Sequence, residues 1–176
     1  MPKTLLVTND FPPVIGGIES YLRDFVSLLD PNEIIIFAPT RDHAACQSYD
    51  AQLDYPVIRW PHRLLLPTPR SAKKLREIIR THDIDTVWFG AAAPLALLAK
   101  TAKQAGAKKV ISTTHGHEVG WSMIPGARQA LRVIGNNSDV LTYISSYTRR
   151  RLEKPFGNRP RWVHLPSCLL YTSPSP

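Results

Sequence analysis

Short apolar runs alternate with longer amphipathic segments along most of the chain. Most of the runs are rich in β-branched residues and are bounded by turn-forming residues, which is typical of buried strands. They lie at residues 3–9, 33–38, 57–60, 86–89, 109–114, 140–144 and 161–165. Each run therefore predicts one strand.

The segments between the runs carry apolar residues at helical spacing. Residues 18–29 show this pattern well, because their apolar side chains recur at intervals of three and four and share one helix face. Thr68 followed by Pro69 is typical of a helix cap and first turn. Further helices are predicted at 94–106, 125–135 and 146–153.

This alternation predicts βαβ units and a mostly parallel sheet. We expect an α/β fold with a Rossmann-like, doubly wound sheet, because no repeat, coiled-coil heptad or linker interrupts the pattern. Such folds bind ligands beyond the carboxyl ends of their strands. The loops that follow the predicted strands are therefore the first places to look for a site.

The composition agrees with one soluble globular domain. Of the 176 residues, 43% are apolar and 20% are charged, whereas disordered chains are poor in apolar residues or dominated by charge. No stretch approaches the roughly 20 apolar residues that a bilayer requires, and we expect no secretory signal. Cys46 and Cys168 do not form a disulfide framework, which favours a reducing cytosol.

The formal net charge of +8 indicates an anionic partner or a solvated basic surface. Residues 63–80 join three leucines to a basic helix, a chemistry that binds anionic membranes, although a solvated helix face over core leucines explains it as well. The shorter basic cluster at 149–154 fits capping and solubility. No nucleic-acid motif is present and no aromatic residues interleave the basic ones, so we expect no nucleic-acid partner.

The loop at residues 10–17 follows the first predicted strand and ends in Gly16 and Gly17, directly before a helix. Glycines there let the backbone approach a ligand, and a helix N-terminus favours negative charge. A simple tight turn is an equally good explanation of the pair. The loop lacks both the G-x-G-x-x-G fingerprint and a P-loop, which disfavours an NAD enzyme or an NTPase.

A second polar loop follows the predicted strand at 109–114 and contains His115, His117 and Glu118. Histidine donates or accepts hydrogen bonds near neutral pH, and strand ends are where α/β folds place their sites. The alternative is a loop of capping residues. The three side chains supply at most three metal ligands and no partner motif is present, so we expect no metal site.

Four stretches together resemble a known enzyme family. They are LLVTNDFPPVIGGIESYLRDF (5–25), STTHGHEVGW (112–121), ISSYTRRRLEK (144–154) and LPS (165–167). Their order and sequence resemble the N-terminal half of a family 4 glycosyltransferase with the two-domain GT-B fold. They are similar to the actinobacterial enzymes of phosphatidylinositol mannoside synthesis, which move mannose from GDP-mannose to a lipid-linked acceptor.

The resemblance implies roles for individual residues. His115 matches the family's strand-end histidine, which would hydrogen-bond the transferred sugar and stabilise the transition state. Gly16 and Gly17 would contact the donor diphosphate or the acceptor. The remaining substrate-binding positions that it implies are His117, Glu118, Asp10 and Arg63, the last toward an acceptor phosphate.

The resemblance also implies the chemistry and the location. The reaction would retain anomeric configuration and need neither a bound metal nor a cofactor, with GDP-mannose as the donor substrate. The basic segment at 63–80 would dock on anionic lipid, which predicts a cytoplasmic protein peripheral to the inner face of the plasma membrane.

The chain departs from the family pattern in its extent. We expect residues 1–167 to form the acceptor-side domain alone, without the second domain that holds most of the nucleotide-sugar site, so that the chain by itself lacks activity. Residues 168–176 resemble a translated sequencing-library adapter, and we expect them to be foreign to the protein. Two alternatives remain: a family 4 enzyme with another donor or a non-lipid acceptor, and a non-catalytic Rossmann-like binding module.

Overall fold

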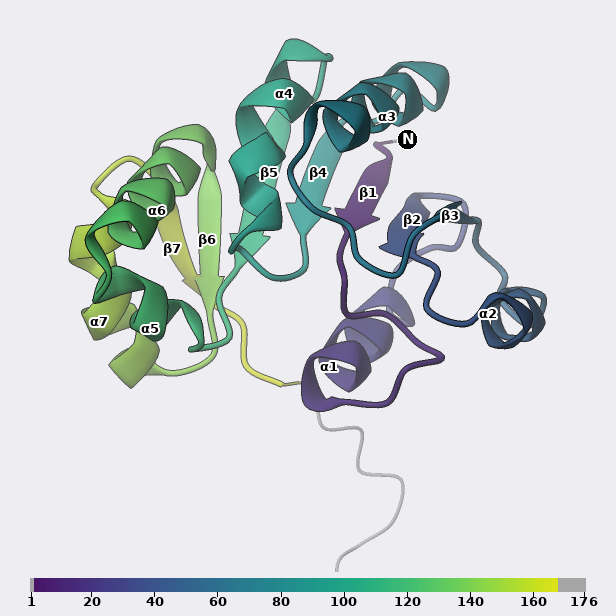
Figure 1. The fold of residues 1–176 in the computed structure, drawn as a ribbon, viewed down its shortest axis with the longest axis horizontal. Coiled ribbons are helices and arrows are strands. Elements are labelled where there is room, and N and C mark those ends of the chain that lie inside the picture. The colour runs from purple at the N-terminus through teal and green to yellow at the C-terminus, as the bar shows by residue number, and fades with distance from the viewer. Residues whose placement is uncertain (1, 168–176) are drawn as a thin grey trace, which may run out of the picture.

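The structure, a computed structural model, describes residues 2–167. Its centre is a seven-stranded parallel sheet with the order β3-β2-β1-β4-β5-β6-β7 (Figure 1). The strands are β1 (Thr4–Val7), β2 (Ile34–Pro39), β3 (Val57–Trp60), β4 (Thr86–Phe89), β5 (Lys109–Thr113), β6 (Val140–Tyr143) and β7 (Arg161–His164). Each strand overlaps one of the predicted runs, and the Rossmann-like α/β fold class is confirmed.

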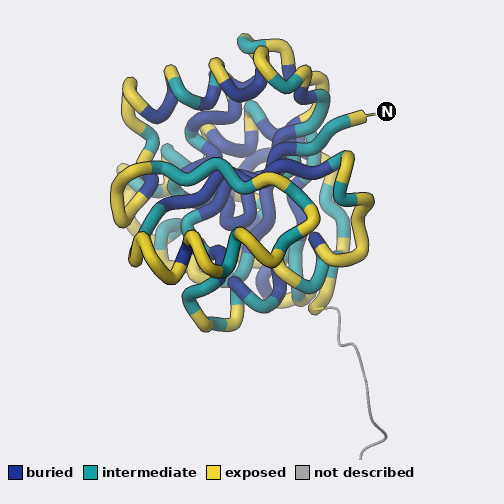
Figure 2. The backbone as a smooth tube through the Cα atoms, turned by 90° about the vertical axis from the view of Figure 1, so that its right-hand side faces the viewer, coloured by how far each residue is buried: buried dark blue, intermediate teal, exposed yellow. Residues whose placement is uncertain are grey.

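Helices pack on both faces of this sheet. They are α1 (Gly17–Val26), α2 (His43–Asp50), α3 (Pro69–Thr81), the short 3₁₀ helix η1 (Leu95–Leu98), α4 (Ala99–Gln104), α5 (Glu118–Ser122), α6 (Pro125–Asn137) and α7 (Ser146–Phe156). Neighbouring residues of a strand point to opposite faces, so the central strands contribute to two cores. In β1, Leu5 and Val7 join the core beneath α3, α4, α6 and α7, whereas Leu6 joins the core beneath α1. Figure 2 shows the buried sheet at the centre and exposed positions on the outer helix turns.

The strand order reverses at the middle of the sheet. There β1 pairs with β2 on one side and with β4 on the other. The chain leaves β1 through α1 on one face and leaves β4 through α4 on the opposite face. The carboxyl ends of β1 and β4 therefore form the topological switch point, where doubly wound folds bind ligands.

The helix α2 corrects the sequence analysis, since the pattern predicts no helix between β2 and β3. The helix is short, and Cys46 is its one buried residue, so the segment lacks the apolar stripe by which a helix is recognised. What starts it is a cap: the Asp42 carboxylate accepts a hydrogen bond from the backbone N–H of Ala45 at 2.8 Å. The helix α5, which begins at Glu118 inside the polar loop, was likewise not predicted.

Residues 2–167 fold around this one sheet. The suspected adapter-derived tail at 168–176 lies outside the described residues, so the boundary predicted at 167 stays a prediction. Within the described part of the chain, no helix combines the length and the apolar character that crossing a membrane requires.

The contact between α6 and α7 is tight enough to test. A Cβ added at Gly135 of α6 would overlap the backbone carbonyl of Phe156 in α7. We expect Gly135→Ala to lower the free energy of unfolding by about 1–3 kcal/mol, because the two helices must move apart. Gly126→Ala on the same helix is the control, since a Cβ there meets nothing within 4 Å. Chemical denaturation measures both variants, and equal stability of the two would contradict the prediction.

Candidate functional site

The loops after β1, β4 and β5 meet at the switch point. In the sheet β4 lies between β1 and β5, so the loop after β4 has both neighbours beside it. The Nε2 of His115, which follows β5, lies 2.7 Å from the carbonyl oxygen of Gly90, which follows β4. The His115 ring also packs against the ring of Tyr21 in α1, nearly perpendicular and 5.1 Å between centroids. Three segments that are distant in the sequence thus converge on His115.

The bond to Gly90 determines which nitrogen of the neutral His115 ring carries the proton. A carbonyl oxygen only accepts, so Nε2 donates and Nδ1 is left as an acceptor. Burial lowers the pKa of His115 below 6.5, against smaller opposing effects of the Gly90 carbonyl and the Glu118 charge. The ring is therefore neutral at pH 7 and has one acceptor nitrogen.

The carboxylate of Glu118 holds the loop that carries His115. The side chain of Glu118 is fully buried and accepts the backbone N–H of His115 at 3.1 Å and of Gly116 at 2.9 Å. Gly116 has a φ of +106°, a conformation that glycine adopts without strain. The Nε2 of His117 lies 3.5 Å from the other carboxylate oxygen. Glu118 positions this loop from inside, and His117, with 42% of its side chain exposed, is the member of the pair that a ligand can reach.

The two glycines at the start of α1 differ in what surrounds them. Gly16 is the N-cap of α1, and a Cβ there would collide with the carboxylate of Glu19, so a larger residue would force that side chain to move. Gly17 is exposed, and a Cβ there would meet nothing within 4 Å. The fold therefore gives no steric reason for glycine at residue 17.

Asp10 lies close enough to the two histidines for their charges to interact. Burial and the charge of Glu19 raise the pKa of Asp10 above 3.8, while the charges of Arg41, His115 and His117 oppose that rise. The backbone N–H of Asp10 donates to the hydroxyl of Thr8 at 2.9 Å, which bends the chain directly after β1. The structure therefore brings Asp10 together with the predicted histidines.

Arg63 is the predicted residue that the structure leaves apart. It is exposed, and within residues 2–167 no hydrogen bond or ion pair joins its side chain to the other predicted positions. Its loop is nevertheless fixed to the switch point, because Asn9 donates to the carbonyl of Leu65 at 2.8 Å and accepts its N–H at 2.7 Å. The loop is thus anchored at Leu65, while the side chain of Arg63 is exposed.

Comparison with known proteins identifies the family. A model of the family described as Glycosyltransferase Family 4 matches residues 15–167. The chain belongs to glycosyltransferase family 4. The resemblance seen in the sequence is confirmed over most of the chain.

Curated relatives of this family 4 domain are mannosyltransferases. The chain is 64% identical over 165 residues to a "GDP-mannose-dependent monoacylated alpha-(1-6)-phosphatidylinositol monomannoside mannosyltransferase" of Corynebacterium glutamicum. It is 52% identical to a "GDP-mannose-dependent alpha-(1-6)-phosphatidylinositol monomannoside mannosyltransferase" of Mycolicibacterium smegmatis. These alignments cover 94% and 92% of the chain but 43% of each relative, so the chain spans less than half of their length.

Solved structures agree on the fold. Anabaena Alr3699/HepE, solved in complex with UDP and glucose, aligns with a TM-score of 0.69 over 96% of this chain and 45% of that chain. Its sequence identity of 13% is so low that the likeness shows the fold alone.

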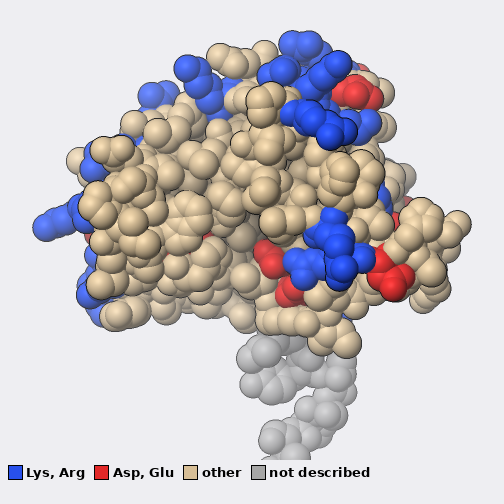
Figure 3. Space-filling view, in the orientation of Figure 1, with Lys and Arg blue, Asp and Glu red and all other residues tan. Residues whose placement is uncertain are grey.

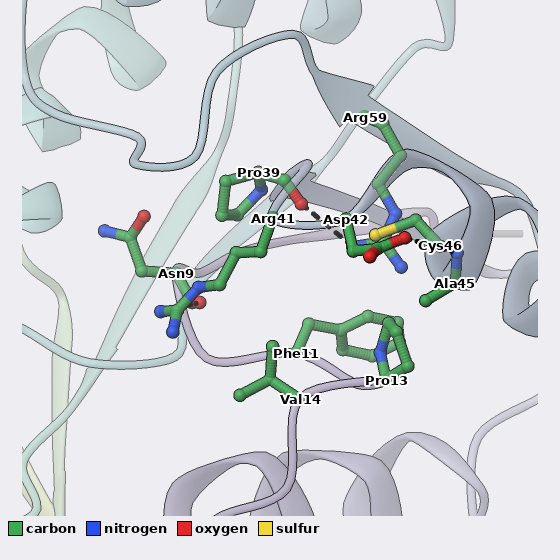
Figure 4. A pocket seen from close by; sticks show the side chains of 10 residues that line it. All are labelled: Asn9, Phe11, Pro13, Val14, Pro39, Arg41, Asp42, Ala45, Cys46 and Arg59. Atoms are coloured by element: carbon green, nitrogen blue, oxygen red, sulfur yellow. Dashed lines mark hydrogen bonds between the residues drawn. The ribbon is translucent and has the colours of Figure 1, made fainter.

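A cavity of about 180 Å³ beside the β1 loop was not predicted (Figure 4). Its lining residues are Asn9, Phe11, Pro13, Val14, Pro39, Arg41, Asp42, Ala45, Cys46 and Arg59. The guanidinium of Arg59 is largely occupied, since it donates to both carboxylate oxygens of Asp50 at 2.9 and 2.7 Å and to the carbonyls of Pro39 and Pro12. Among the described residues, Arg41 makes a single hydrogen bond, at 3.2 Å, to the carbonyl of Asn9. Arg41 closely follows the end of β2, and that position was the signal that could have identified it.

Tyr21 is a second residue of the site that the sequence pattern did not single out. Its hydroxyl donates to the carbonyl of Leu165 at 2.7 Å, so α1 is tied to the end of the described chain. Burial raises the pKa of Tyr21 to about 12, which keeps the hydroxyl protonated and able to donate. In the sequence Tyr21 looks like any other apolar position of the predicted helix.

The buried His115 predicts a pH dependence. Its pKa is about 6.5 in the unfolded chain and lower in the folded chain, so between these values the unfolded state binds more protons. We expect the contribution of His115 to stability to be complete above about pH 6.5 and to be lost as the pH falls through the folded pKa. An NMR titration of the ring protons, assigned with His115→Gln, measures the folded pKa. A value at or above 6.5 would contradict the prediction.

Proposed function

We propose that this chain is the acceptor-side domain of a retaining glycosyltransferase that moves mannose from GDP-mannose to a phosphatidylinositol mannoside. The observation that carries the proposal is the 64% identity to the Corynebacterium glutamicum mannosyltransferase across 94% of the chain. Because the chain spans 43% of that relative, the donor nucleotide would be bound mainly by the remainder of a full-length protein. The chain alone would then bind acceptor without turning over.

His115 would bind the sugar that is transferred. Its Nε2 is engaged by Gly90 and its ring rests on Tyr21, so both the tautomer and the orientation of the ring are set before any ligand arrives. The free Nδ1 would accept a hydrogen bond from a sugar hydroxyl. A preorganised partner of this kind lowers the transition-state energy, because it need not reorient as charge develops.

The start of α1 would bind the acceptor rather than the donor diphosphate. The carboxylate of Glu19 lies beside Gly16, and Asp10 is close enough to interact with it. Two carboxylates repel a phosphate but accept hydrogen bonds from hydroxyl groups. The open space at Gly17 would then admit the hydroxyl-bearing ring of the acceptor, with Arg63 toward its phosphate.

We propose no metal or cofactor for this reaction, with GDP-mannose acting as a substrate. The proposal follows the family resemblance. Within residues 2–167, no three side chains of histidine, cysteine, aspartate or glutamate come together as a metal-binding group.

The outer face of α3 would bind an anionic membrane on the cytoplasmic side. Its apolar residues are buried, and its basic ones, Arg70, Lys73, Lys74, Arg76 and Arg80, lie on the other side of the helix. Figure 3 shows these charges gathered at the top of the molecule, over α3. Leu64 and Leu66 in the preceding loop are 50% and 44% exposed, whereas Leu65 between them is buried. Basic groups beside exposed leucines suit a peripheral membrane contact and need no nucleic-acid partner.

An assay of the full-length protein tests the activity. We expect transfer of radiolabelled mannose from GDP-mannose to phosphatidylinositol mannoside in vesicles, and a loss of roughly 100-fold or more in His115→Ala. His43→Ala, an exposed residue of α2, is the control and should keep its activity. Absence of mannose transfer by the wild-type protein would refute the proposed reaction. Unchanged turnover in His115→Ala would show that His115 is only structural.

Vesicle flotation tests the membrane face. We expect the triple variant Arg70→Glu, Lys73→Glu and Arg80→Glu to lose at least tenfold in affinity for anionic vesicles, since each basic residue contributes about 1 kcal/mol near such a surface. The matched control is Lys109→Glu, Arg159→Glu and Arg161→Glu, which changes the net charge equally at other exposed positions. Equal losses in both triple variants would attribute binding to net charge rather than to α3.

A further inference from the structure

A second basic surface lies where α5, α6 and α7 meet, away from α3. It is a cleft of about 480 Å³ lined by Arg128 of α6 and by Arg150, Arg151 and Lys154 of α7, with Ser122 and Met123 at the end of α5. Basic side chains gather at the left of Figure 3, where Figure 1 places α6 and α7. The sequence pattern attributes the α7 charges to capping and solubility, but it gives no sign that Arg128 joins them.

In the part of the chain that the structure describes, the four cations of this cleft have no anionic partner. No carboxylate lines the cleft, and none of the four side chains forms an ion pair within residues 2–167. The neighbouring Arg149 differs, because its Nε bonds Glu153 at 2.6 Å and so uses the acidic residue of that helix. Like charges held together repel one another, and an anion that binds among them removes this repulsion.

The N-terminus of α6 adds to the positive potential. The helix begins at Pro125 after Ile124, which has no side-chain oxygen, and no side chain caps it. The N–H groups of Gly126 and Ala127 in the first turn therefore remain available. A Cβ at Gly126 would meet nothing within 4 Å, so the surface beside this first turn is open. Arg128, which lines the cleft, stands on the same first turn of α6, whose end carries a partial positive charge.

We propose that the cleft between α5, α6 and α7 binds a phosphate group, held by Arg128, Arg150, Arg151 and Lys154 and by the first turn of α6. Guanidinium groups bind phosphate oxygens through paired N–H donors, a geometry that suits phosphate better than a monatomic anion. Met123 and Ile124 at the edge are 72% and 61% exposed. The phosphate belongs either to the headgroup of a phospholipid or to a soluble phosphoester. In the first case Met123 and Ile124 would contact the acyl chains of the lipid.

NMR titration of the intact chain with inorganic phosphate tests the site itself. We expect shifts of the Gly126 and Ala127 amide signals that saturate with phosphate and that are absent in the double variant Arg128→Glu, Arg151→Glu. The control is Arg159→Glu, Arg161→Glu, which has the same net charge and should shift as the wild type does. All four substituted residues are exposed, and circular dichroism checks that both variants keep the fold.

Flotation with vesicles distinguishes the two sources of the phosphate. If the site takes a headgroup, the cleft variant should bind vesicles of phosphatidylcholine and phosphatidylinositol more than about tenfold less tightly than the control variant. If the site takes a soluble phosphoester, both variants should bind the vesicles equally. Only the control variant should then show shifts of the amide signals when inorganic phosphate is added. Absence of amide shifts in the wild type, equal shifts in both variants, or tighter binding of an RNA oligonucleotide than of phosphate would overturn the proposal.

Discussion

The parallel pairing of β1 with β4 is the constraint on which the candidate site depends. Leu6 pairs with Trp88 and Val7 with Phe89, so two strands that are far apart in the sequence lie side by side at the centre of the sheet. Because all the strands are parallel, their carboxyl ends share one edge, and β5 follows beside β4. His115 reaches the loop after β4 only because of this order. The chain leaves β1 and β4 toward opposite faces of the sheet. The helices that follow therefore leave the region between these two strand ends uncovered.

Buried polar groups then hold this edge in one arrangement. The indole N–H of Trp88 donates to the hydroxyl of Thr113 at 2.8 Å, and the hydroxyl of Thr142 donates to the same oxygen at 2.8 Å. These bonds link β4, β5 and β6 directly beneath the loop that carries His115. An unpaired buried polar group costs about 1–3 kcal/mol, so a displaced strand end would be penalised. The buried Glu118 restrains the loop itself, because it accepts the backbone N–H groups of His115 and Gly116. The carbonyl of Gly90 holds the ring of His115 from the other side.

The excess of positive charge is divided among surfaces with different roles. Arg59 serves the fold, because Asp50 and two backbone carbonyls occupy its guanidinium. The basic side chains of α3 lie opposite a buried apolar face and next to exposed leucines. The basic side chains of the cleft between α5, α6 and α7 line it together, and no carboxylate lies among the lining residues. Much of the net charge of +8 therefore lies on two surfaces, which are the ones we propose to bind phosphate-bearing partners.

The sequence by itself determined the succession of strands and helices, the fold class and the loops in which the site lies. Those features depend on periodicity and turn residues, which are properties of neighbouring positions. It did not reveal α2, whose start depends on the Asp42 cap rather than on an apolar stripe. Only the tertiary structure decided that His115 bonds the Gly90 carbonyl, that Glu118 is buried beneath its own loop and that Arg128 joins the α7 cations. Such contacts join residues brought together by strand order and helix packing, and no local pattern encodes which distant residues will meet.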